Sequence, residues 1–333
     1  MTSTYPLLFT PILKSKVWGG RRLASLGKAL PPDVPIGESW EIADLDSTSP
    51  SGGGGDAAHS VIRNGALAGK TIGEAIETWG PELMGELDAH GGFPLLVKYL
   101  DAQTNLSVQV HPSAEYAARH PEALLKTEAW YVVEAAPGAL IYAGIREGVT
   151  PEQFAALART GEIESVMAAI PVKPGDCYNL PSGTVHALGG GVLVAEVQTP
   201  SDTTFRLYDW GRTGRELHIE QAIECAAVGP LEIPRQPDSP AAGVERLMVT
   251  EFFTIDRRVG PVDGSALGLP ARRPRVLMCL HGAGRVESAS GSFDSTELGA
   301  GDTALAPAGL REPVLILDEG AVVLDVTVGS LSE

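Results

Sequence analysis

The stretch Asn105-Leu106-Ser107-Val108-Gln109-Val110-His111-Pro112 decides the fold that this chain is expected to adopt. Its β-branched valines alternate with polar residues, which is the pattern of a strand with one buried face. Because successive side chains on a strand point to opposite faces, Ser107, Gln109 and His111 share one face. The stretch therefore predicts a strand that presents an amide and an imidazole to a common point.

The bulk composition indicates a folded protein with a substantial core and an acidic surface. Of the 333 residues 44% are hydrophobic, and 42 acidic residues against 25 basic ones give a formal net charge of -17. This charge argues against nucleic acid and anionic membranes as partners, whereas a few cations focused in a cleft can still accommodate a small anionic substrate. The 39 glycines and 25 prolines are typical of many short strands joined by tight turns.

The cysteines and the hydropathy bear on the cellular location. Cys177, Cys225 and Cys279 are odd in number and form no C-x-x-C pair, which favours small buried thiols in a reducing cytosol. Residues 1–10 lack the pattern of a signal peptide, and no 18-residue apolar stretch predicts a membrane span. We therefore expect a cytoplasmic protein with no membrane partner.

A few short helices are expected among the strands. Residues 71–87 have helical spacing with a break at Pro81, Ser113 has the chemistry of an N-cap, and Thr150-Pro151-Glu152-Gln153 carries a capping signal. After residue 249 the pattern predicts strands only, over residues 251–257, 275–281, 284–289, 302–306 and 314–326.

A weak internal repeat suggests two β-rolls. Residues 173–183 resemble residues 299–309, since both have Gly-Asp before an apolar strand that ends in Pro-x-Gly. We interpret them as two copies of one roll, with chance recurrence of a common turn as the alternative. The position that corresponds to His186 is Glu312, so the second roll is expected to lack a metal ligand. We expect it to cover edge strands of the first roll and to leave the active site before about residue 215.

Four polar side chains on the predicted strands form a candidate metal site. Two imidazoles, a carboxylate and an amide oxygen make a mixed nitrogen and oxygen set that suits zinc and tolerates other divalent ions. The set consists of Gln109, His111, Glu128 and His186. Taken singly, a histidine or glutamate on a strand is more often a structural residue, and only the joint pattern favours a metal.

Cations near these residues could form an anion site. Lys98, Lys126 and Arg206 carry the ammonium and guanidinium groups that hold phosphate, although each could equally be a surface charge. Glu196 and Lys126 could serve as general acid and base if burial or a neighbouring charge moved the pKa of either group toward neutrality. The sequence does not decide between them.

The chain resembles the type I phosphomannose isomerases in their compact bacterial form. The resemblance rests on Ser-Val-Gln-Val-His-Pro ending at Pro112, Lys-Thr-Glu ending at Glu128, and Gly-Thr-Val-His-Ala around His186. Further matching pieces are Trp18-Gly19-Gly20, Gly37-Glu38-Ser39-Trp40-Glu41, residues 93–100 and residues 196–206. They spread over the first two-thirds of the chain, and this combination is specific.

The resemblance implies a mainly β, cupin-type double jelly roll with a few short helices. Residues 1–228 would form a catalytic roll and residues 244–333 a C-terminal roll without a metal site. It also implies one zinc ion per chain, held by Gln109, His111, Glu128 and His186. The implied catalytic residues are Arg206, Lys126 and Glu196, and the implied substrate-binding residues are Trp18, Glu41, Lys98, Ser107 and Asp202.

The implied reaction interconverts mannose 6-phosphate and fructose 6-phosphate through a cis-enediol. A phosphorylated hexose would be the partner, and the protein would be a monomer or a weak homodimer. Three alternatives stay open: an isomerase of another aldose, a non-catalytic sensor of sugar phosphates, and a cupin oxygenase. Gln109 in place of a third histidine and the surrounding lysine and arginine residues disfavour the oxygenase.

Overall fold

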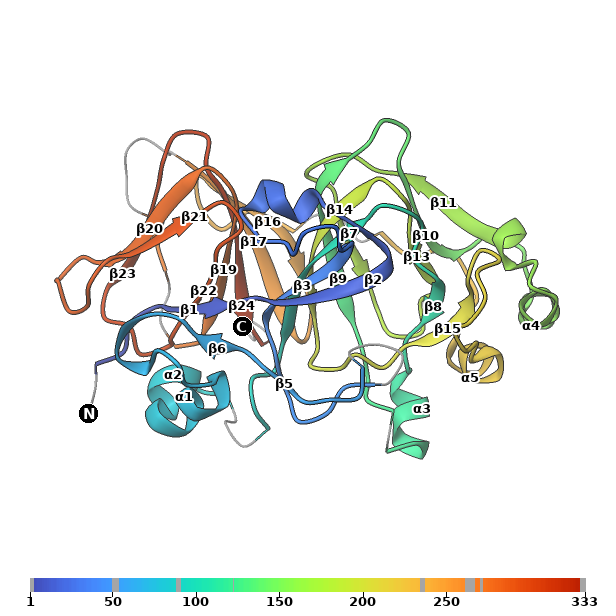
Figure 1. Cartoon of the computed structure of the whole chain (residues 1–333), viewed down its shortest axis with the longest axis horizontal. Helices are drawn as coiled ribbons and strands as arrows, with labels where there is room; N and C mark the ends of the chain where they lie inside the picture. The colour runs from blue at the N-terminus through green and yellow to red at the C-terminus, as the bar shows by residue number, and fades with distance from the viewer. Residues whose placement is uncertain are drawn as a thin grey trace.

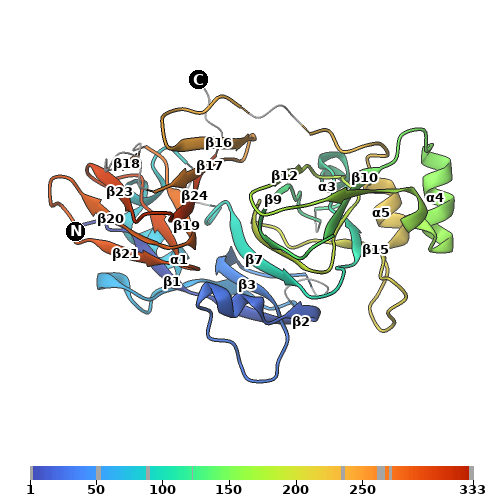
Figure 2. The same cartoon turned by 90° about the horizontal axis from the view of Figure 1, so that it is seen from above.

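Two β-rolls lie side by side in this computed structural model, which describes residues 3–49, 54–87, 91–121, 123–233, 237–260, 267–269 and 272–329 (Figure 1, Figure 2). Each roll pairs two antiparallel sheets, and a two-stranded ribbon of β4 (Asp44–Leu45) and β5 (Ala58–His59) lies apart from them. Short helices make up the rest of the regular structure. The prediction of a mainly β double roll is confirmed.

The first roll faces a five-stranded sheet with a six-stranded one. The five-stranded sheet has the order β11 (Met167–Pro171), β10 (Leu140–Ile145), β13 (His186–Leu188), β8 (Val108–Val110) and β15 (Phe205–Tyr208). The six-stranded sheet has the order β12 (Cys177–Leu180), β9 (Glu128–Ala135), β14 (Val192–Gln198), β7 (Leu96–Ala102), β2 (Ile12–Gly20) and β3 (Ile36–Ile42). Trp130, Val132 and Leu188 belong to the core between them.

The second roll takes strands from both ends of the chain. Its larger sheet has the order β16 (Val244–Val249), β17 (Phe253–Val259), β24 (Val322–Val328), β19 (Arg275–His281), β22 (Thr303–Ala306), β1 (Leu7–Thr10) and β6 (Val61–Ile62). Its smaller sheet has the order β18 (Leu267–Gly268), β23 (Pro313–Leu317), β20 (Ala283–Ser288) and β21 (Thr296–Gly299). The division into residues 1–228 and 244–333 stays a prediction, and any such division has to place β1 and β6 in the second roll.

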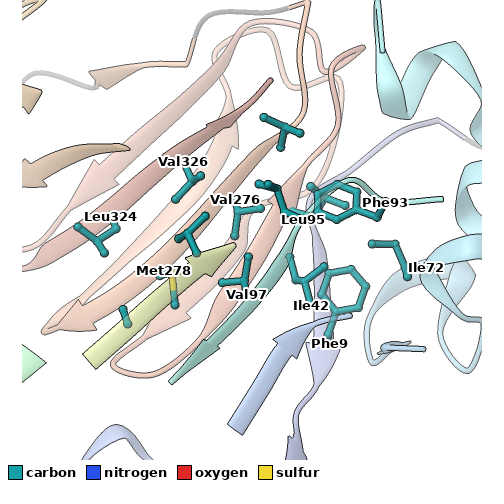
Figure 3. Packing of buried hydrophobic residues seen from close by; sticks show 14 of the residues in the cluster. Phe9, Ile42, Ile72, Phe93, Leu95, Val97, Val276, Met278, Leu324 and Val326 are labelled. Carbon is teal, nitrogen blue, oxygen red and sulfur yellow. The ribbon is translucent and has the colours of Figure 1, made fainter. Parts of the chain in front are cut away.

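The largest apolar cluster lies between the rolls. Val97 of the six-stranded sheet belongs to the same cluster as Val276 and Met278 of the seven-stranded sheet, and all three are fully buried (Figure 3). The two rolls pack face to face, and β16 and β1 of the second roll also contact β12 and β3, so the expected cover of edge strands is part of a larger interface. Apolar side chains on the hidden face of each sheet require a partner surface, and each roll supplies it to the other.

Five α-helices of the described residues flank the rolls. They are α1 (Ile72–Trp79), α2 (Pro81–Met84), α3 (Ala114–Arg119), α4 (Pro151–Thr160) and α5 (Ile219–Cys225). The predicted caps are present, since Thr71 and Thr150 form capping boxes and Ser113 accepts a hydrogen bond from the Tyr116 amide. Short 3₁₀ helices cover Arg22–Leu26, Gly65–Leu67 and Ile163–Val166. No helix within the described ranges is long and apolar enough to span a membrane.

Two predicted strands differ from the structure. The strand expected over residues 105–112 is limited to β8, and Pro112 has no amide hydrogen to extend the ladder. Residues 314–326 form two strands, β23 and β24, because the chain turns back at Asp318 and Gly320, where Ala321 N donates to Asp318 O and Gly320 has φ +73°. An apolar pattern alone does not locate a tight turn between two buried strands.

The predicted repeat is visible as the same turn in both rolls. Asp176 Oδ2 accepts a hydrogen bond from Lys173 N, and Asp302 Oδ2 accepts one from Gly299 N, each at 2.9 Å. The intervening glycines, Gly175 and Gly301, have positive φ. The strand order β12-β9-β14-β7 of the first roll is matched by β22-β19-β24-β17 in the second. Together these features favour two copies of one unit over chance recurrence.

A buried ion cluster stabilises the inside of the second roll. Asp325 is fully buried, with its carboxylate 2.6 Å from Arg258 Nε and 2.7 Å from an Arg275 terminal nitrogen. Burial alone would raise the pKa of Asp325, but Arg275 and then Arg258 outweigh it and hold the pKa below the usual value. Both cations would lose their partner if this carboxylate were removed.

Asp325→Asn should therefore destabilise the protein strongly, by about 3–5 kcal/mol, because it leaves buried guanidinium groups uncompensated. Chemical denaturation at neutral pH, followed by circular dichroism, measures the loss. Since the folded pKa is depressed, the stabilisation is present above the ordinary aspartate pKa and is lost as pH falls through the folded value. The gap between wild type and variant should close in acid.

The matched control is Glu220→Gln, which removes the exposed ion pair between Arg159 and Glu220. Its denaturation midpoint should equal that of the wild type. An Asp325→Asn midpoint that is also unchanged would contradict the assignment of this cluster as a stabilising element.

Candidate functional site

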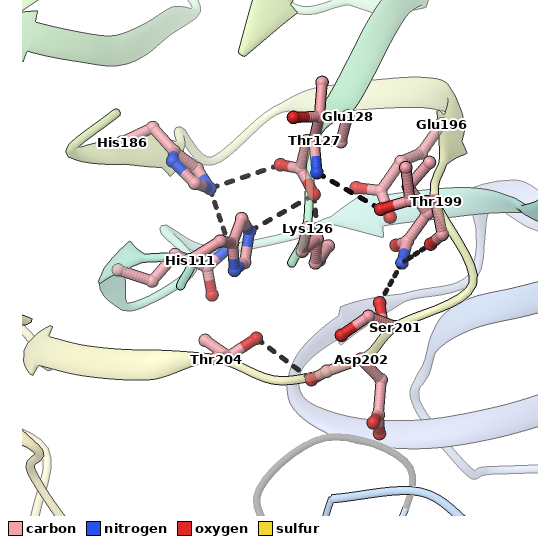
Figure 4. A network of polar contacts seen from close by, with 12 residues as sticks. His111, Lys126, Thr127, Glu128, His186, Glu196, Thr199, Ser201, Asp202 and Thr204 are labelled. Carbon is pink, nitrogen blue, oxygen red and sulfur yellow. Dashed lines mark hydrogen bonds and ion pairs between the residues drawn. The ribbon is translucent and has the colours of Figure 1, made fainter. Parts of the chain in front are cut away.

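A buried cluster of two imidazoles and one carboxylate lies inside the first roll. Glu128 Oε2 is 3.3 Å from His111 Nε2, and Glu128 Oε1 is 3.2 Å from His186 Nε2 (Figure 4). All three side chains are essentially inaccessible to solvent, and their potential ligand atoms lie within 4.8 Å of one another. The arrangement gathers one oxygen and two nitrogen donors around a single point.

The cluster forms because strands of both sheets converge there. His186 and Gln109 are directly paired on β13 and β8 of the five-stranded sheet, while Glu128 begins β9 of the six-stranded sheet. His111 follows β8, one residue after its last paired position. Gln109 and His111 point to the same side, as the alternation of the opening stretch predicted.

Backbone carbonyls orient both imidazoles for metal binding. The Nδ1 atom of His111 lies 3.0 Å from Thr203 O, and that of His186 lies 2.8 Å from Thr184 O. A carbonyl can only accept, so each Nδ1 carries the proton and each Nε2 presents its lone pair to Glu128. His111 Nε2 and both Glu128 oxygens are buried without a well-directed hydrogen bond among the described residues. These donors fit a divalent cation.

The charges of the cluster also suit a cation. Burial, followed by the nearby Lys126, lowers the pKa of His111 to about 3, so its imidazole is neutral at physiological pH. Burial alone would raise the pKa of Glu128, but Lys126 at 2.8 Å and then His111 hold it well below its usual range. A neutral imidazole and an ionised carboxylate are the forms that bind metal ions.

Gln109 completes the set. The side-chain amide atom assigned as Gln109 Nε2 lies 3.1 Å from His186 Nε2. Because amide oxygen and nitrogen are interchangeable by a half-turn of the side chain, the oxygen can occupy the same place and face a metal held by the two histidines.

A cavity of about 250 Å³ opens from this cluster. Gln109 and Lys126, which both contact the cluster, form part of its wall. The charged lining comprises five cations and three carboxylates, namely Lys16, Lys98, Lys126, Arg206, Arg215, Glu38, Glu196 and Asp202. A cation-rich cavity in a chain of formal charge -17 is a local feature that attracts an anionic ligand.

Lys98 lies between two carboxylates in the wall of the cavity. Its ammonium is 2.8 Å from Glu196 Oε1 and 3.9 Å from Glu38 Oε2. Burial opposes the charge of Lys98, but Glu196 and then Glu38 outweigh it and raise its pKa above the usual value. Burial would likewise raise the pKa of Glu38, yet Lys16 and Lys98 lower it to about 2. Lys98 is therefore a permanent cation.

The other oxygen of Glu196 is fixed by an indole. Trp130 Nε1 donates to Glu196 Oε2 at 2.8 Å, and Trp130, Glu196 and Lys98 face one another across adjacent strands. The carboxylate is 2% exposed and lines the cavity. It is thus held in one orientation next to the space where a ligand would lie.

Two arginines also line the cavity. Arg215 is bound to the carboxylate of Asp209, whereas Arg206 donates from a terminal nitrogen to the Glu216 carbonyl at 2.7 Å. Arg206 Nε is buried without a hydrogen-bond partner among the described residues. Arg206 also pairs directly with Gln109 across β15 and β8, which places it close to the cluster.

Comparisons with known proteins agree with this geometry. Residues 7–134 match the family model of the phosphomannose isomerase type I catalytic domain. A mannose-6-phosphate isomerase of Bacillus subtilis is 36% identical over 93% of this chain and 95% of its own length. The chain belongs to the type I phosphomannose isomerase family. A mannose-6-phosphate isomerase of Streptococcus mutans is also 36% identical, over 84% of this chain and 86% of its own.

Solved structures of phosphomannose isomerases have the same fold. The crystal structure of a Bacillus subtilis mannose 6-phosphate isomerase superposes with a TM-score of 0.83 at 28% identity, covering 97% of this chain and 99% of the other. A mutant phosphomannose isomerase of Salmonella typhimurium superposes with a TM-score of 0.77 at 17% identity, covering 98% and 100%. The fold of this isomerase family is the expected cupin-type double roll.

Most of the expected site residues lie around the cluster and the cavity. Trp18, Lys98, Ser107, Gln109, Lys126, Glu196, Asp202 and Arg206 line the cavity, and His111, Glu128 and His186 form the cluster. Asp202 additionally accepts hydrogen bonds from Ser49 N at 2.8 and 3.0 Å, so it also holds the neighbouring loop.

Glu41 lies elsewhere, and the expectation that it lines the substrate pocket does not fit the structure. Its carboxylate pairs with Lys28 at 2.7 Å on the face of β3 that is turned away from the cavity. Glu38 and Trp40, one strand position to either side of Ser39, line the cavity instead. The reason is the alternation of β3, which places neighbouring residues on opposite faces.

Nine further residues of the cavity wall were not predicted as site residues, and Lys16, Glu38, Trp40 and Arg215 are among them. For Glu38 and Trp40 the sequence did contain a signal, because the alternation of side chains on a strand places both on the face opposite Glu41. Arg215 carried no such signal, because it lies in a loop after β15 where no periodicity applies.

The cluster should bind one divalent metal ion per chain. His111→Ala or His186→Ala should lose most of the metal, since each leaves too few donors, while Gln109→Ala should lose less because water can replace a neutral amide oxygen. Elemental analysis of dialysed protein measures the occupancy. The control is His281→Ala, which changes a histidine of the second roll. Full occupancy in a folded His186→Ala variant would contradict the ligand assignment.

Proposed function

We propose that this protein is a zinc-dependent isomerase that interconverts mannose 6-phosphate and fructose 6-phosphate through a cis-enediol. The observation that carries the proposal is the buried cluster of His111, Glu128 and His186 beside a cation-lined cavity, which it meets through Gln109 and Lys126. The names of the relatives support the substrate assignment. A phosphorylated hexose would be the ligand of the cavity.

The donor set favours zinc as the bound metal. Two imidazoles, one carboxylate and one amide oxygen, from His111, His186, Glu128 and Gln109, suit a tetrahedral ion of borderline softness, one per chain. A bound zinc ion would act as a Lewis acid that stabilises negative charge on the sugar oxygens at C1 and C2.

The remaining chemistry is the transfer of a proton between C1 and C2. We propose Glu196 as the group that transfers it, because Trp130 and Lys98 hold its carboxylate at the cavity wall. Lys126 is the second candidate, since it also lines the cavity. Its ammonium is bound to Glu128 Oε2 at 2.8 Å, which places it beside the cluster and suits it to stabilising charge on a sugar oxygen.

The substrate phosphate would bind at the arginine side of the cavity. Arg206 has an unused buried Nε donor, and Arg215 and Ser107 lie in the same wall. A phosphate held there fixes the sugar at one end and orients C1 and C2 for reaction. Trp18 and Asp202, which line the same cavity, would contact the sugar between these two ends.

Two other functions are compatible with the same pocket. An isomerase of a different aldose would use the same cluster and differ in its contacts to the sugar hydroxyls. A non-catalytic sensor would bind metal and sugar phosphate without turnover. We propose that the protein is a monomer or a weak homodimer.

Activity should depend on the metal. A coupled assay with mannose 6-phosphate should show turnover that a chelator abolishes and that added Zn²⁺ restores. Glucose 6-phosphate and unphosphorylated mannose serve as controls for sugar and phosphate recognition. Metal-loaded protein that binds mannose 6-phosphate but never converts it would contradict the isomerase function and support the sensor.

Glu196→Gln should lower kcat by about 100-fold to 10,000-fold, the range for loss of a general acid–base group, and should leave metal content unchanged. Turnover in deuterium oxide, followed by NMR, separates proton transfer from hydride transfer, because an enediol route lets solvent deuterium enter the product. A Glu196→Gln variant with near-normal kcat would exclude Glu196 as the transferring group and would favour Lys126.

A further inference from the structure

A buried ion pair lies behind the pocket, at the interface between the two rolls. Lys28 Nζ is 2.7 Å from Glu41 Oε2, and the two side chains are only 7% and 4% exposed. The same ammonium donates to the carbonyl of Gly301 at 2.7 Å. Gly301 belongs to the turn before β22, so Lys28 joins β3 of the first roll to the backbone of the second.

Two more side chains complete this inter-roll cluster. Ser39 Oγ donates to Glu41 Oε1 at 2.6 Å, and the Lys28 ammonium lies 5.3 Å from the ring centroid of Tyr99. Both Ser39 and Tyr99 are fully buried and pair directly across β3 and β7. The inter-roll cluster of Lys28, Ser39, Glu41 and Tyr99 therefore holds the same two strands that line the pocket.

The two faces of these strands have separate partners. On the pocket side β3 presents Glu38 and Trp40, and β7 presents Lys98. On the other side the intervening residues, Ser39, Glu41 and Tyr99, meet the second roll. Because both sets of side chains share one backbone, a shift of β3 against the second roll also moves Glu38 and Trp40 within the pocket.

The backbones of the two rolls also meet at the turn that Lys28 contacts. Gly301 has φ +86°, and a Cβ atom there would lie 1.8 Å from Leu26 O, so the two backbones are in direct contact. The surrounding interface is apolar, and apolar contact is non-directional. An ion pair with hydrogen bonds is directional. Because burying its charges costs desolvation free energy, the pair adds little to stability by itself. Its place here is better explained by the alignment it imposes.

We propose that Glu41 is a positioning residue for the pocket. With Lys28 it fixes β3 and β7 against the Gly301 turn, so the second roll sets the positions of Glu38, Trp40 and Lys98. This inference rests on the isomerase function proposed above, and it gives the second roll a part in the activity although no described residue of that roll lines the pocket.

Glu41→Gln tests the proposal, because glutamine keeps the size of the side chain and removes its charge. The variant should retain its metal and show a KM for mannose 6-phosphate raised about tenfold together with a lower kcat, since small displacements of positioned groups have effects of this order. A loss of folded protein alone would lower the apparent kcat and leave KM unchanged. KM is therefore the deciding measurement.

A second set of variants guards against misfolding. Lys28→Met should reproduce the KM effect, Lys28→Arg should keep near-normal KM, and the double variant Lys28→Met/Glu41→Gln should be no worse than either single one, because both remove the same interaction. Ser39→Ala, which removes one hydrogen bond to Glu41, should raise KM by a smaller factor. Glu220→Gln, at the exposed pair with Arg159, should leave KM unchanged.

Wild-type KM in folded, metal-loaded Glu41→Gln and Lys28→Met overturns the proposal. Failure of the isomerase function would be seen in the wild type itself, as absence of turnover. In that case calorimetric titration with mannose 6-phosphate decides, and equal affinity in wild type and Glu41→Gln overturns the positioning role.

Discussion

The alternation of side chains in the six-stranded sheet is the constraint on which both the core and the site depend. On β14, Glu196 faces the cavity while its neighbours Ala195 and Val197 belong to the cluster between the rolls. On β7, Lys98 faces the cavity and Val97 packs against the second roll. A register shift of one residue would exchange the two faces, burying charges in an apolar interface and removing them from the pocket. Folding and chemistry therefore require the same strand register.

The second roll shows what the same scaffold becomes without a metal. If the two rolls are aligned on their shared Gly-Asp turn, the pairing of Glu128 with Leu180 corresponds to the pairing of Arg275 with Ala306. Arg275 thus occupies the place of Glu128, the carboxylate that is proposed to bind the metal. A guanidinium cannot bind a cation, and here it is neutralised by Asp325, which corresponds to Glu196 by its pairing. In the second roll these polar positions are satisfied by ion pairing with each other. In the first roll the corresponding positions would face a metal.

The sequence was sufficient for the cluster because each of its residues lies on or beside a strand whose alternation could be read directly. Gln109 and His111 share a face by spacing alone, Glu128 and His186 lie on other predicted strands, and the resemblance to the isomerase family implies the same four residues. The resemblance implied Glu41 as a pocket residue, whereas the alternation of β3 turns Glu38 and Trp40 toward the cavity and Glu41 away from it. Pairing of β1 with β22 was not predictable, because it joins residues about 300 positions apart and leaves no local pattern.

The charges of the cavity are arranged before any substrate is present. Lys98 is balanced by Glu196 and Glu38, Lys126 by Glu128, and Arg215 by Asp209, so each of these three cations already has a carboxylate within ion-pair distance. Arg206 differs, because within the described ranges it forms no ion pair and its Nε has no acceptor. A buried donor without an acceptor is costly, and an anion is the ligand that would satisfy it. The distribution of pairs therefore supports the proposal that the anionic end of the substrate would bind at Arg206, with the sugar carbons between Glu196 and the cluster of His111, Glu128 and His186.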